Sequence, residues 1–221
     1  TMSPNLVKLI TKNHKNTKRN YDARMISTKP HVMKISKKYG FHYWDGNRKF
    51  GYGGYNDDGR WKSVAKKIIK KYKLTNKSKV LDIGCGKGYL VKELSLALKS
   101  KNIYGVDISN YAINKSPKII KKNLKVFDAR NKFNFNKKFD LVISINLIHN
   151  FELKDVFKFL KNVVSISKNS YISTESYRNE KELYNLQCWA LTCESFFSDK
   201  EWRWIFNNSH YYRDYELIYF T

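Results

Sequence analysis

A glycine-rich turn carries the first residues whose types and spacing could do chemistry. Asp82 is followed by Gly84, Gly86 and Gly88, so glycine occupies every second position. Glycine lets the backbone approach a ligand closely, and such a turn between a strand and a helix is typical of nucleotide-binding α/β folds. In the dinucleotide fingerprint the third glycine comes one residue later, where this chain has Tyr89. This spacing, and a carboxylate that repels pyrophosphate, argue against a dinucleotide.

Two further acids, Asp107 and Asp128, each end a short apolar run. The carboxyl ends of parallel strands meet at one sheet edge, where ligands bind in this architecture, so we expect both near Asp82. Asp107 can accept hydrogen bonds from two ribose hydroxyls. Asp128 can accept one from an adenine amino group, while the N–H of Ala129 faces a ring nitrogen. S-adenosylmethionine carries these groups with an ammonium and a sulfonium but no phosphate, so the three acids predict it as the cofactor.

Alternating strands and helices must position these acids. Apolar runs predict strands at residues 79–83, 103–106, 124–127, 139–145, 170–174 and 215–220. Helical spacing of apolar residues predicts helices at residues 61–72, 89–98, 111–120, 153–164 and 180–191. Ser198, with Glu201 three residues later, predicts the start of a last helix. The alternation predicts an α/β fold: a mostly parallel central sheet with helices on both faces and an antiparallel closing strand.

Residues 79–174 resemble the class I S-adenosylmethionine-dependent methyltransferases. The resemblance rests on four features in order: the turn that starts at Asp82, the acid at Asp107, the pair Asp128-Ala129, and the segment Phe139-Asp140-Leu141-Val142. It implies a Rossmann-like fold, S-adenosylmethionine as cofactor and methyl transfer. The loop at 51–61 and the region 175–206 also resemble a small bacterial subgroup, to which we attach no acceptor.

The sequence predicts two sets of site residues and no metal site. We expect the cofactor to contact Asp82, Gly84, Cys85, Gly86, Gly88, Asp107, Ile108, Asp128, Ala129, Asn146, Tyr55 and Arg60. The catalytic candidates are His149, Asn146 and Tyr52. His149 follows the fourth strand and is either a general base or acceptor-orienting residue, or a structural residue that caps the next helix. Cys85 is expected to be a small residue of the turn and not a nucleophile.

The chain divides into an N-terminal part, residues 1–60, and a methyltransferase domain, residues 61–221. We expect Lys12 to Lys29 to be a flexible or loosely packed, basic arm. The loop at 51–61, rich in Gly and Tyr, is expected to fold over the cofactor as a lid, with Arg60 pairing with its carboxylate; alternatively its rings pack the N-terminal segment on the sheet. The segment 177–197 is expected to be an insertion that walls an acceptor pocket, with Tyr184, Trp189, Phe196 and Phe197 as candidates, or to contribute these rings to the core.

The charge of the chain is strongly one-sided. Lys and Arg number 43 against 19 Asp and Glu, a net charge of +24. Residues 1–138 hold 34 basic and 8 acidic residues, whereas residues 139–221 hold 9 and 11. A positive field attracts polyanions, although Lys far outnumbers Arg, and a compositional drift toward Lys, Asn, Ile and Tyr gives the same excess.

Composition also excludes several classes of protein. Three cysteines cannot form a disulfide scaffold, and no apolar run reaches the roughly 20 residues of a membrane span. The first residues have no apolar segment of the kind that a secretion signal carries, so we expect a cytoplasmic protein. The sequence leaves the oligomeric state open.

Three functions remain compatible with these observations. The first, which we favour, is a methyltransferase that acts on a small molecule by in-line transfer. The alternative is an RNA or protein methyltransferase that binds a polyanion through the basic N-terminal half. The third is a non-catalytic binding module that keeps the fold.

Overall fold

A seven-stranded sheet forms the centre of the computed structural model, which describes residues 3–135 and 138–221. The strand order is β1-β7-β6-β5-β2-β3-β4, and every neighbouring pair is parallel. The strands are β1 (Asn5–Leu6), β2 (Val80–Ile83), β3 (Ile103–Asp107), β4 (Leu124–Val126), β5 (Phe139–Ile145), β6 (Ser167–Ser176) and β7 (Asp214–Tyr219). The predicted parallel α/β sheet is therefore confirmed.

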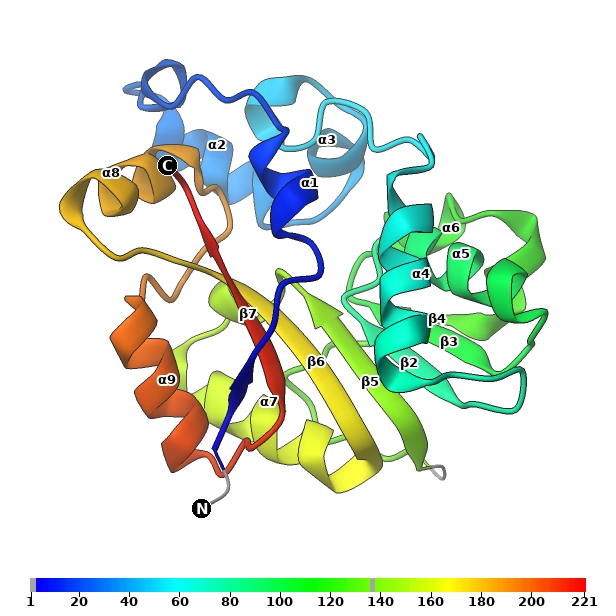
Figure 1. Cartoon of the computed structure of the whole chain (residues 1–221). Helices are drawn as coiled ribbons and strands as arrows, with labels where there is room; N and C mark the ends of the chain where they lie inside the picture. Colours follow the sequence, from blue (N-terminus) through cyan, green and yellow to red (C-terminus); the bar gives the residue numbers. More distant parts are fainter. Residues whose placement is uncertain (1–2, 136–137) are drawn as a thin grey trace.

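Helices cover both faces of this sheet (Figure 1). The α-helices are α1 (Thr11–Lys15), α2 (Lys29–Ser36), α3 (Phe41–Trp44), α4 (Arg60–Tyr72), α5 (Tyr89–Leu98), α6 (Asn110–Asn114), α7 (Leu153–Ile166), α8 (Glu180–Trp189) and α9 (Asp199–Asn208). One core lies between the sheet and α4 and α5, and includes Ile68 and Leu94. The other lies between the sheet and α7 and α9, and includes Phe159 and Trp202. Both faces of the sheet are buried, which explains why its strands read as continuous apolar runs.

The antiparallel closing strand is a wrong expectation, because β7 runs parallel to β6 with Tyr171 opposite Asp214. Helix α9 lies between these strands in the chain and packs its apolar side on the sheet, so the chain returns to the starting end before β7 begins. A crossover of this kind requires a parallel pair. The predicted start of α9 is confirmed, since Ser198 and Glu201 form a reciprocal capping box.

The single helix expected at residues 111–120 is also wrong. The structure has a short α6 and then a 3-10 helix, η3 (Lys118–Asn123). Pro117 lies between them and has an extended ψ of 135°. Proline cannot donate the helical hydrogen bond and its ring clashes with the preceding turn, so the helix ends before it.

The flexible arm expected from Lys12 to Lys29 is folded. Helix α1 and a 3-10 turn, η1 (Asp22–Arg24), cover the end of the sheet, and β1 pairs with β7. The buried carboxylate of Glu216 anchors this segment by accepting the backbone N–H groups of Leu9, Ile10 and Thr11. A carboxylate at a helix start pairs with N–H groups that have no helical partner. A contact across some 200 residues thus orders a segment that looks polar and weakly periodic.

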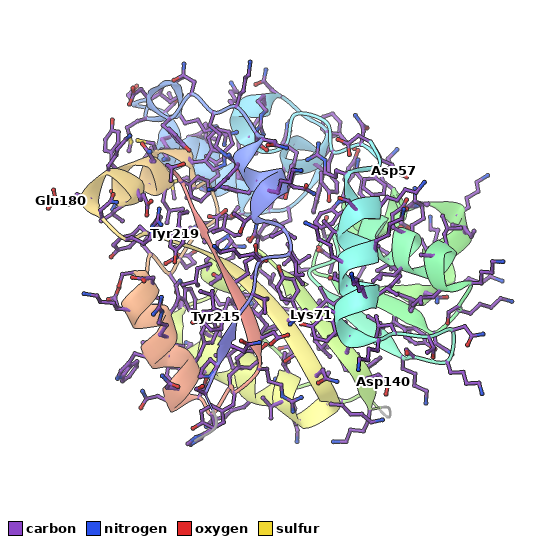
Figure 2. All side chains as sticks on the ribbon, viewed as in Figure 1. Asp57, Lys71, Asp140, Glu180, Tyr215 and Tyr219 are labelled. Carbon is purple, nitrogen blue, oxygen red and sulfur yellow. The ribbon has the colours of Figure 1, made fainter. Side chains whose placement is uncertain are left out.

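The two ends of the sheet have different roles. The strands point toward α1, α2, α3 and α8, which gather beyond the carboxyl ends (Figure 1). Asp140 lies at the opposite end from Asp57 and Glu180 (Figure 2). It accepts the N–H of Lys79 and pairs with Lys168, which are structural contacts.

Within the described residues, no helix has the length and apolar character needed to cross a membrane.

Candidate active site

The indole ring of Trp44 covers the glycine turn that follows β2. Gly84, Gly86 and Gly88 all have positive φ, a backbone conformation that favours glycine. A Cβ on Gly86 would lie 2.7 Å from the Trp44 ring, so only glycine fits there. A Cβ on Gly88 would meet Ile120 and Leu124 at 2.7 Å, which places Gly88 against the core and not beside a ligand. We expected Gly88 to contact the cofactor, but it lines neither of the two main cavities.

Asp82 is a buried carboxyl group at the end of β2. Burial, and then the charge of Asp107, raise the pKa of Asp82 from 3.8 to about 8. No group among the described residues donates a hydrogen bond to it. A buried acid without a donor is costly to ionise, and a cationic ligand relieves that cost. Cys85, which lines the same cavity, has a pKa raised by burial, which agrees with a small, unreactive residue.

Asp107 holds the turn in place from the end of β3. Its Oδ2 accepts the N–H of Gly86 at 2.8 Å, and its Oδ1 accepts that of Ser109 at 2.8 Å. Burial raises the pKa of Asp107, although both N–H groups act in the opposite direction. Each oxygen keeps a further lone pair, so the group can also accept from a ligand. Ile108 follows it and lines the same cavity as Asp107.

Asp128 and Ala129 lie beside Asp107 at the same sheet edge, as predicted. The Asp128 carboxylate is already paired with Arg130, whose Nε and backbone N–H lie 2.9 and 3.0 Å from Oδ1. This bond to Arg130 lowers the pKa of Asp128, so the group is ionised and acts only as an acceptor. Ala129 is buried. The pairing with Arg130 was not expected from the sequence.

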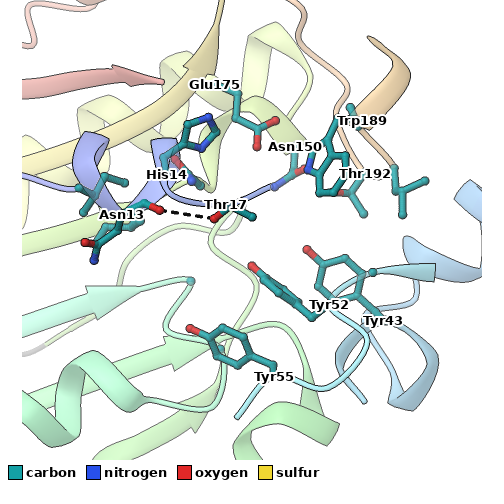
Figure 3. A pocket seen from close by; sticks show the side chains of 18 of the residues that line it. Asn13, His14, Thr17, Tyr43, Tyr52, Tyr55, Asn150, Glu175, Trp189 and Thr192 are labelled. Carbon is teal, nitrogen blue, oxygen red and sulfur yellow. Dashed lines mark hydrogen bonds between the residues drawn. The ribbon is translucent and has the colours of Figure 1, made fainter. Parts of the chain in front are cut away.

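Two cavities meet at the carboxyl ends of the strands. The smaller has a volume of about 240 Å³ and is lined by Asp107, Ile108, Asp128 and Ala129, among others. The larger, of about 620 Å³, is lined by Asp82, Cys85, Gly86, His149 and Glu175, among others. Asn146 and Gly84 line both, as do Tyr43, Trp44 and Tyr52. In Figure 3, His14, Glu175 and Trp189 lie on one side of the larger cavity, and Tyr43, Tyr52 and Tyr55 on the other.

Residues 41–55 cover the glycine turn, and this cover begins ten residues earlier than the loop predicted to be a lid. The Tyr52 ring stacks on Trp44 at 5.3 Å, and the Tyr55 ring stacks on Tyr89 at 5.2 Å. Lys87 of the turn donates to both oxygens of Asp45, at 2.6 and 2.8 Å. Lys87 also donates to the carbonyl oxygen of Tyr55. The rings therefore pack the N-terminal segment and wall the cavities at the same time.

Arg60 lies at the rim of the larger cavity, but Asp58 engages its guanidinium. Both side chains are about half exposed. The hydrogen bond from Arg60 lowers the pKa of Asp58, so the pair is charged. Tyr55 is nearer the interior, and its hydroxyl accepts the indole N–H of Trp61 at 2.9 Å.

Asn146 and His149 follow β5 as predicted. Asn146 has a φ of 51°, a left-handed value that is uncommon outside glycine and concentrates at functional sites. Ser173 fixes it, since the Ser173 hydroxyl donates to Asn146 Oδ1 at 3.0 Å. His149 is buried, and burial lowers its pKa while the charge of Glu175 acts in the opposite direction. Its ring is therefore neutral near pH 7.

The segment 177–197 contributes one of its four candidate rings to the larger cavity. Trp189, at the end of α8, lines it together with the adjoining residues 190–193. Tyr184 instead points outward, is 49% exposed and donates to Asp22. Phe196 and Phe197 pack against the hydrophobic cores. Helical spacing identifies an apolar side but not which ring faces a cavity.

Several cavity residues were missed from the sequence, most of them in the segment expected to be flexible or between that segment and the predicted lid loop. They are Asn13, His14, Thr17, Arg19, Arg24, Tyr43, Trp44 and Arg48, together with Asn150. One signal could have pointed to them: four of the eight arginines precede residue 61, although Lys dominates that half. Asn150 Oδ1 is buried without a hydrogen-bond partner among the described residues.

The residues present fit S-adenosylmethionine. Asp82 is a buried acid without a donor and faces the larger cavity, where a cationic ammonium would offset its burial. Asp107 reaches the smaller cavity, where it can accept from ribose hydroxyls. Within residues 3–135 and 138–221, no group of three or more His, Cys, Asp or Glu side chains could hold a metal ion.

A parallel sheet with a glycine turn and acids at the ends of neighbouring strands defines a Rossmann-like cofactor-binding protein. Residues 74–210 match the family model described as "Methyltransferase domain". This match covers more than half of the chain, which therefore belongs to the methyltransferase domain family, the S-adenosylmethionine-dependent class I methyltransferases.

Relatives and solved structures agree with this family. The chain is 34% identical over 107 residues to the ribosomal RNA small subunit methyltransferase C of Buchnera aphidicola subsp. Acyrthosiphon pisum (strain APS). The match covers 45% of this chain but only 30% of that relative. Magnesium protoporphyrin IX methyltransferase from Synechocystis PCC 6803, solved with bound SAH, has the same fold: the TM-score is 0.56 at 18% identity, covering 82% of this chain and 88% of that one.

A third comparison concerns a Haloferax volcanii protein solved in complex with the Trm112 methyltransferase activator. Its TM-score is 0.54 at 19% identity, covering 69% of this chain and 70% of that chain. At such identities the likeness concerns the fold alone.

Proposed function

We propose that the chain transfers a methyl group from S-adenosylmethionine to a small-molecule acceptor that binds in the larger cavity. The main support is the shape of this cavity. Its wall combines the glycine turn with the N-terminal segment and with residues 189–193, so that it is bounded on several sides. Its volume of about 620 Å³ lies in the range of small-molecule sites, about 300–1,000 Å³.

Each part of the site has a role in this proposal. Asp82 would hold the ammonium of the cofactor, Asp107 its ribose, and Asp128 with Ala129 its adenine. When bound, the cofactor supplies an electrophilic methyl group on its sulfonium sulfur. The covering rings of Tyr52 and Tyr55 would exclude water from the site. They would also lie beside the sulfonium, because a cation interacts favourably with aromatic rings.

His149 and Glu175 would handle the acceptor proton. The His149 Nε2 lies 3.5 Å from Glu175 Oε2, and both residues line the larger cavity. A neutral imidazole beside a carboxylate can take a proton and share the resulting charge. Asn146, held by Ser173, would orient the acceptor.

An RNA acceptor is the second candidate. The observation in its favour is the excess of 34 basic over 8 acidic residues in positions 1–138. The partial similarity to a ribosomal RNA methyltransferase points in the same direction. Against it, most of this charge comes from Lys, whereas bidentate phosphate recognition favours Arg.

Methyl-labelled S-adenosylmethionine distinguishes the two candidates. The protein is incubated separately with a low-molecular-weight metabolite fraction, with total RNA and with a protein extract, and the label is followed. We expect label in the metabolite fraction only. Label in RNA that falls steeply with added salt would favour the second candidate. Binding of the cofactor with no label in any fraction would favour a non-catalytic binding module.

A further inference from the structure

Three arginines converge on one tryptophan at the inner wall of the larger cavity. The guanidinium carbon of Arg24 lies 4.0 Å from the centre of the Trp189 ring, that of Arg48 5.1 Å and that of Arg19 5.2 Å. All four residues line the larger cavity. Arg19 and Arg24 come from the N-terminal segment, Arg48 from the cover of the glycine turn and Trp189 from α8, so only the tertiary structure brings them together.

No carboxylate in the described part of the chain forms an ion pair with these arginines. Within the described residues, none of the ion pairs involves Arg19, Arg24 or Arg48. Arg24 donates to backbone carbonyls, among them that of Gly51, and Arg48 donates to the same oxygen. Arg19 donates to the carbonyls of His14 and Thr17, and its buried Nε has no partner among the described residues. A guanidinium has five donors, so several remain available.

The arrangement is electrostatically unfavourable without an anion. Burial, followed by the charges of Arg48 and Arg19, lowers the pKa of Arg24 to about 10. The carboxylate whose charge acts on Arg19 is Glu175, which His149 already engages. Like charges that are held together and partly buried are stabilised by a ligand of opposite charge.

We propose that Arg19, Arg24 and Arg48 form an anion subsite in the larger cavity, and that the acceptor is a small molecule with a carboxylate or phosphate group. This inference rests on the proposed function, since it names the chemical class of the acceptor. Guanidinium forks match the planar oxygens of these groups. The three cations lie around the Trp189 ring, so the charged end of the acceptor lies at this wall and its reacting atom is directed toward Asn146 and His149.

A small anion fits the site better than a nucleic acid backbone. Arg19 and Arg24 are partly buried beside Trp189, whereas the lysines that dominate the charge are mostly exposed. A polyanion that follows a surface would meet those lysines first. One group of negative charge that enters this cavity of about 620 Å³ would meet guanidinium groups that all line it.

The test measures binding of two aromatic probes, benzoate and phenyl phosphate, to protein saturated with S-adenosylhomocysteine, with benzamide as the neutral probe. Ligand-observed NMR detects such weak binding. We expect both anions to bind and benzamide not to bind. Arg48→Gln and Arg24→Gln should each weaken anion binding at least about tenfold, the loss expected for a charge-assisted hydrogen bond. Arg48→Lys, which keeps the charge, should lose less.

Arg203→Gln is the matched control, because Arg203 is exposed on α9 and pairs with Asp199. It should bind the probes like the unaltered protein. Arg24 also holds backbone carbonyls, so if Arg24→Gln unfolds, Arg48→Gln with Arg48→Lys decides the question. Melting curves identify such a loss of folding.

Four outcomes would overturn the subsite. The anions bind the Gln variants as tightly as the unaltered protein, or they fail to bind the unaltered protein. Alternatively, calorimetry shows that S-adenosylhomocysteine affinity falls in parallel, so the arginines hold the cofactor carboxylate. RNA binding that all three arginines support, without binding of the probes, would also refute it. If the unaltered protein does not bind S-adenosylhomocysteine, the proposed function itself fails, and this result is read independently of the probes.

Discussion

Glu175 contacts both nitrogens of the His149 ring. Its backbone N–H donates to Nδ1 at 3.4 Å, and its carboxylate Oε2 lies 3.5 Å from Nε2. Both contacts are longer than the usual hydrogen-bond length of about 2.9–3.0 Å, so they orient the imidazole ring and leave it able to take a proton. His149 and Glu175 therefore act as one unit, and neither can be replaced without changing the other.

Replacing His149 with Ala should reduce turnover far more than cofactor affinity. A general base contributes about 10²–10⁴-fold to the rate, so we expect a fall of at least about 10²-fold. Turnover is measured with the acceptor found by methyl labelling, and cofactor affinity by calorimetry. His210→Ala, at an exposed histidine, is the control. Unchanged turnover in His149→Ala would make this residue structural.

The pH profile of turnover tests the same unit. Burial lowers the pKa of His149, so the ring stays neutral below its ordinary value of 6.5. Turnover should therefore persist below pH 6.5 and decrease only as the pH falls through the lowered pKa. Glu175→Gln removes the negative charge that raises the pKa of His149. The acidic limb of this variant's pH profile of turnover should therefore move to still lower pH. A limb that moves to higher pH in this variant would contradict the assignment.

Asp107→Ala should lose most cofactor affinity. It removes two acceptors for ribose hydroxyls and releases the N–H of Gly86, which now has no partner. Hydrogen bonds to charged groups are worth about 1.5–3 kcal/mol, so we expect a loss of roughly 30-fold or more in calorimetry with S-adenosylhomocysteine. Asp140→Ala, at the opposite end of the sheet, is the control. Near-normal affinity in Asp107→Ala would refute the ribose assignment.

Asp82 should link cofactor binding to pH. Its pKa is raised to about 8, so much of the group is protonated at pH 7, whereas a cationic ligand binds the ionised form. Binding should release protons, and affinity should rise between pH 6 and pH 8. Calorimetry in buffers of different ionisation enthalpy measures the protons released. Asp82→Asn should release fewer protons and bind more weakly; equal proton release would contradict this role.

The same carboxyl group should destabilise the protein without its cofactor. Its folded-state pKa of about 8 exceeds the ordinary value of 3.8, so the folded state binds more protons between these limits. Its contribution to the free energy of unfolding therefore decreases as the pH rises from 3.8 toward 8. At pH 8, Asp82→Asn should have a higher melting temperature than the unaltered protein, by roughly 2–4 °C for each kcal/mol gained in the free energy of unfolding. The difference should be smaller at pH 5. A lower melting temperature at pH 8 would contradict this.

The contact between Lys87 and Asp45 should hold the cover on the glycine turn. The Lys87 side chain is only 5% exposed and donates to Asp45 and to the Tyr55 carbonyl. Lys87→Met leaves Asp45 without this partner, and breaking a buried pair costs about 3–5 kcal/mol, less here because Asp45 is partly exposed. We expect faster limited proteolysis within residues 41–60 and weaker cofactor binding. Lys92→Met, at a more exposed pair with Asp57, should change neither.

The sequence by itself predicted every strand of the sheet except β1, together with the glycine turn and the set of three acids. Asp82, Asp107 and Asp128 do lie at one sheet edge, because parallel strands place their carboxyl ends together. The capping box at Ser198 also formed as predicted. These features are encoded within short stretches, where apolar periodicity, glycine spacing and capping residues act on neighbouring positions.

Only the tertiary structure decided the direction of β7, the course of the N-terminal segment and the assembly of the cavity wall. Arg24 and Trp189 are separated by 165 positions, and Glu216 anchors Leu9 across 207. No local pattern reports such contacts, because buried hydrogen bonds and ring contacts form only when distant segments meet. A basic, polar segment therefore folded into part of the site.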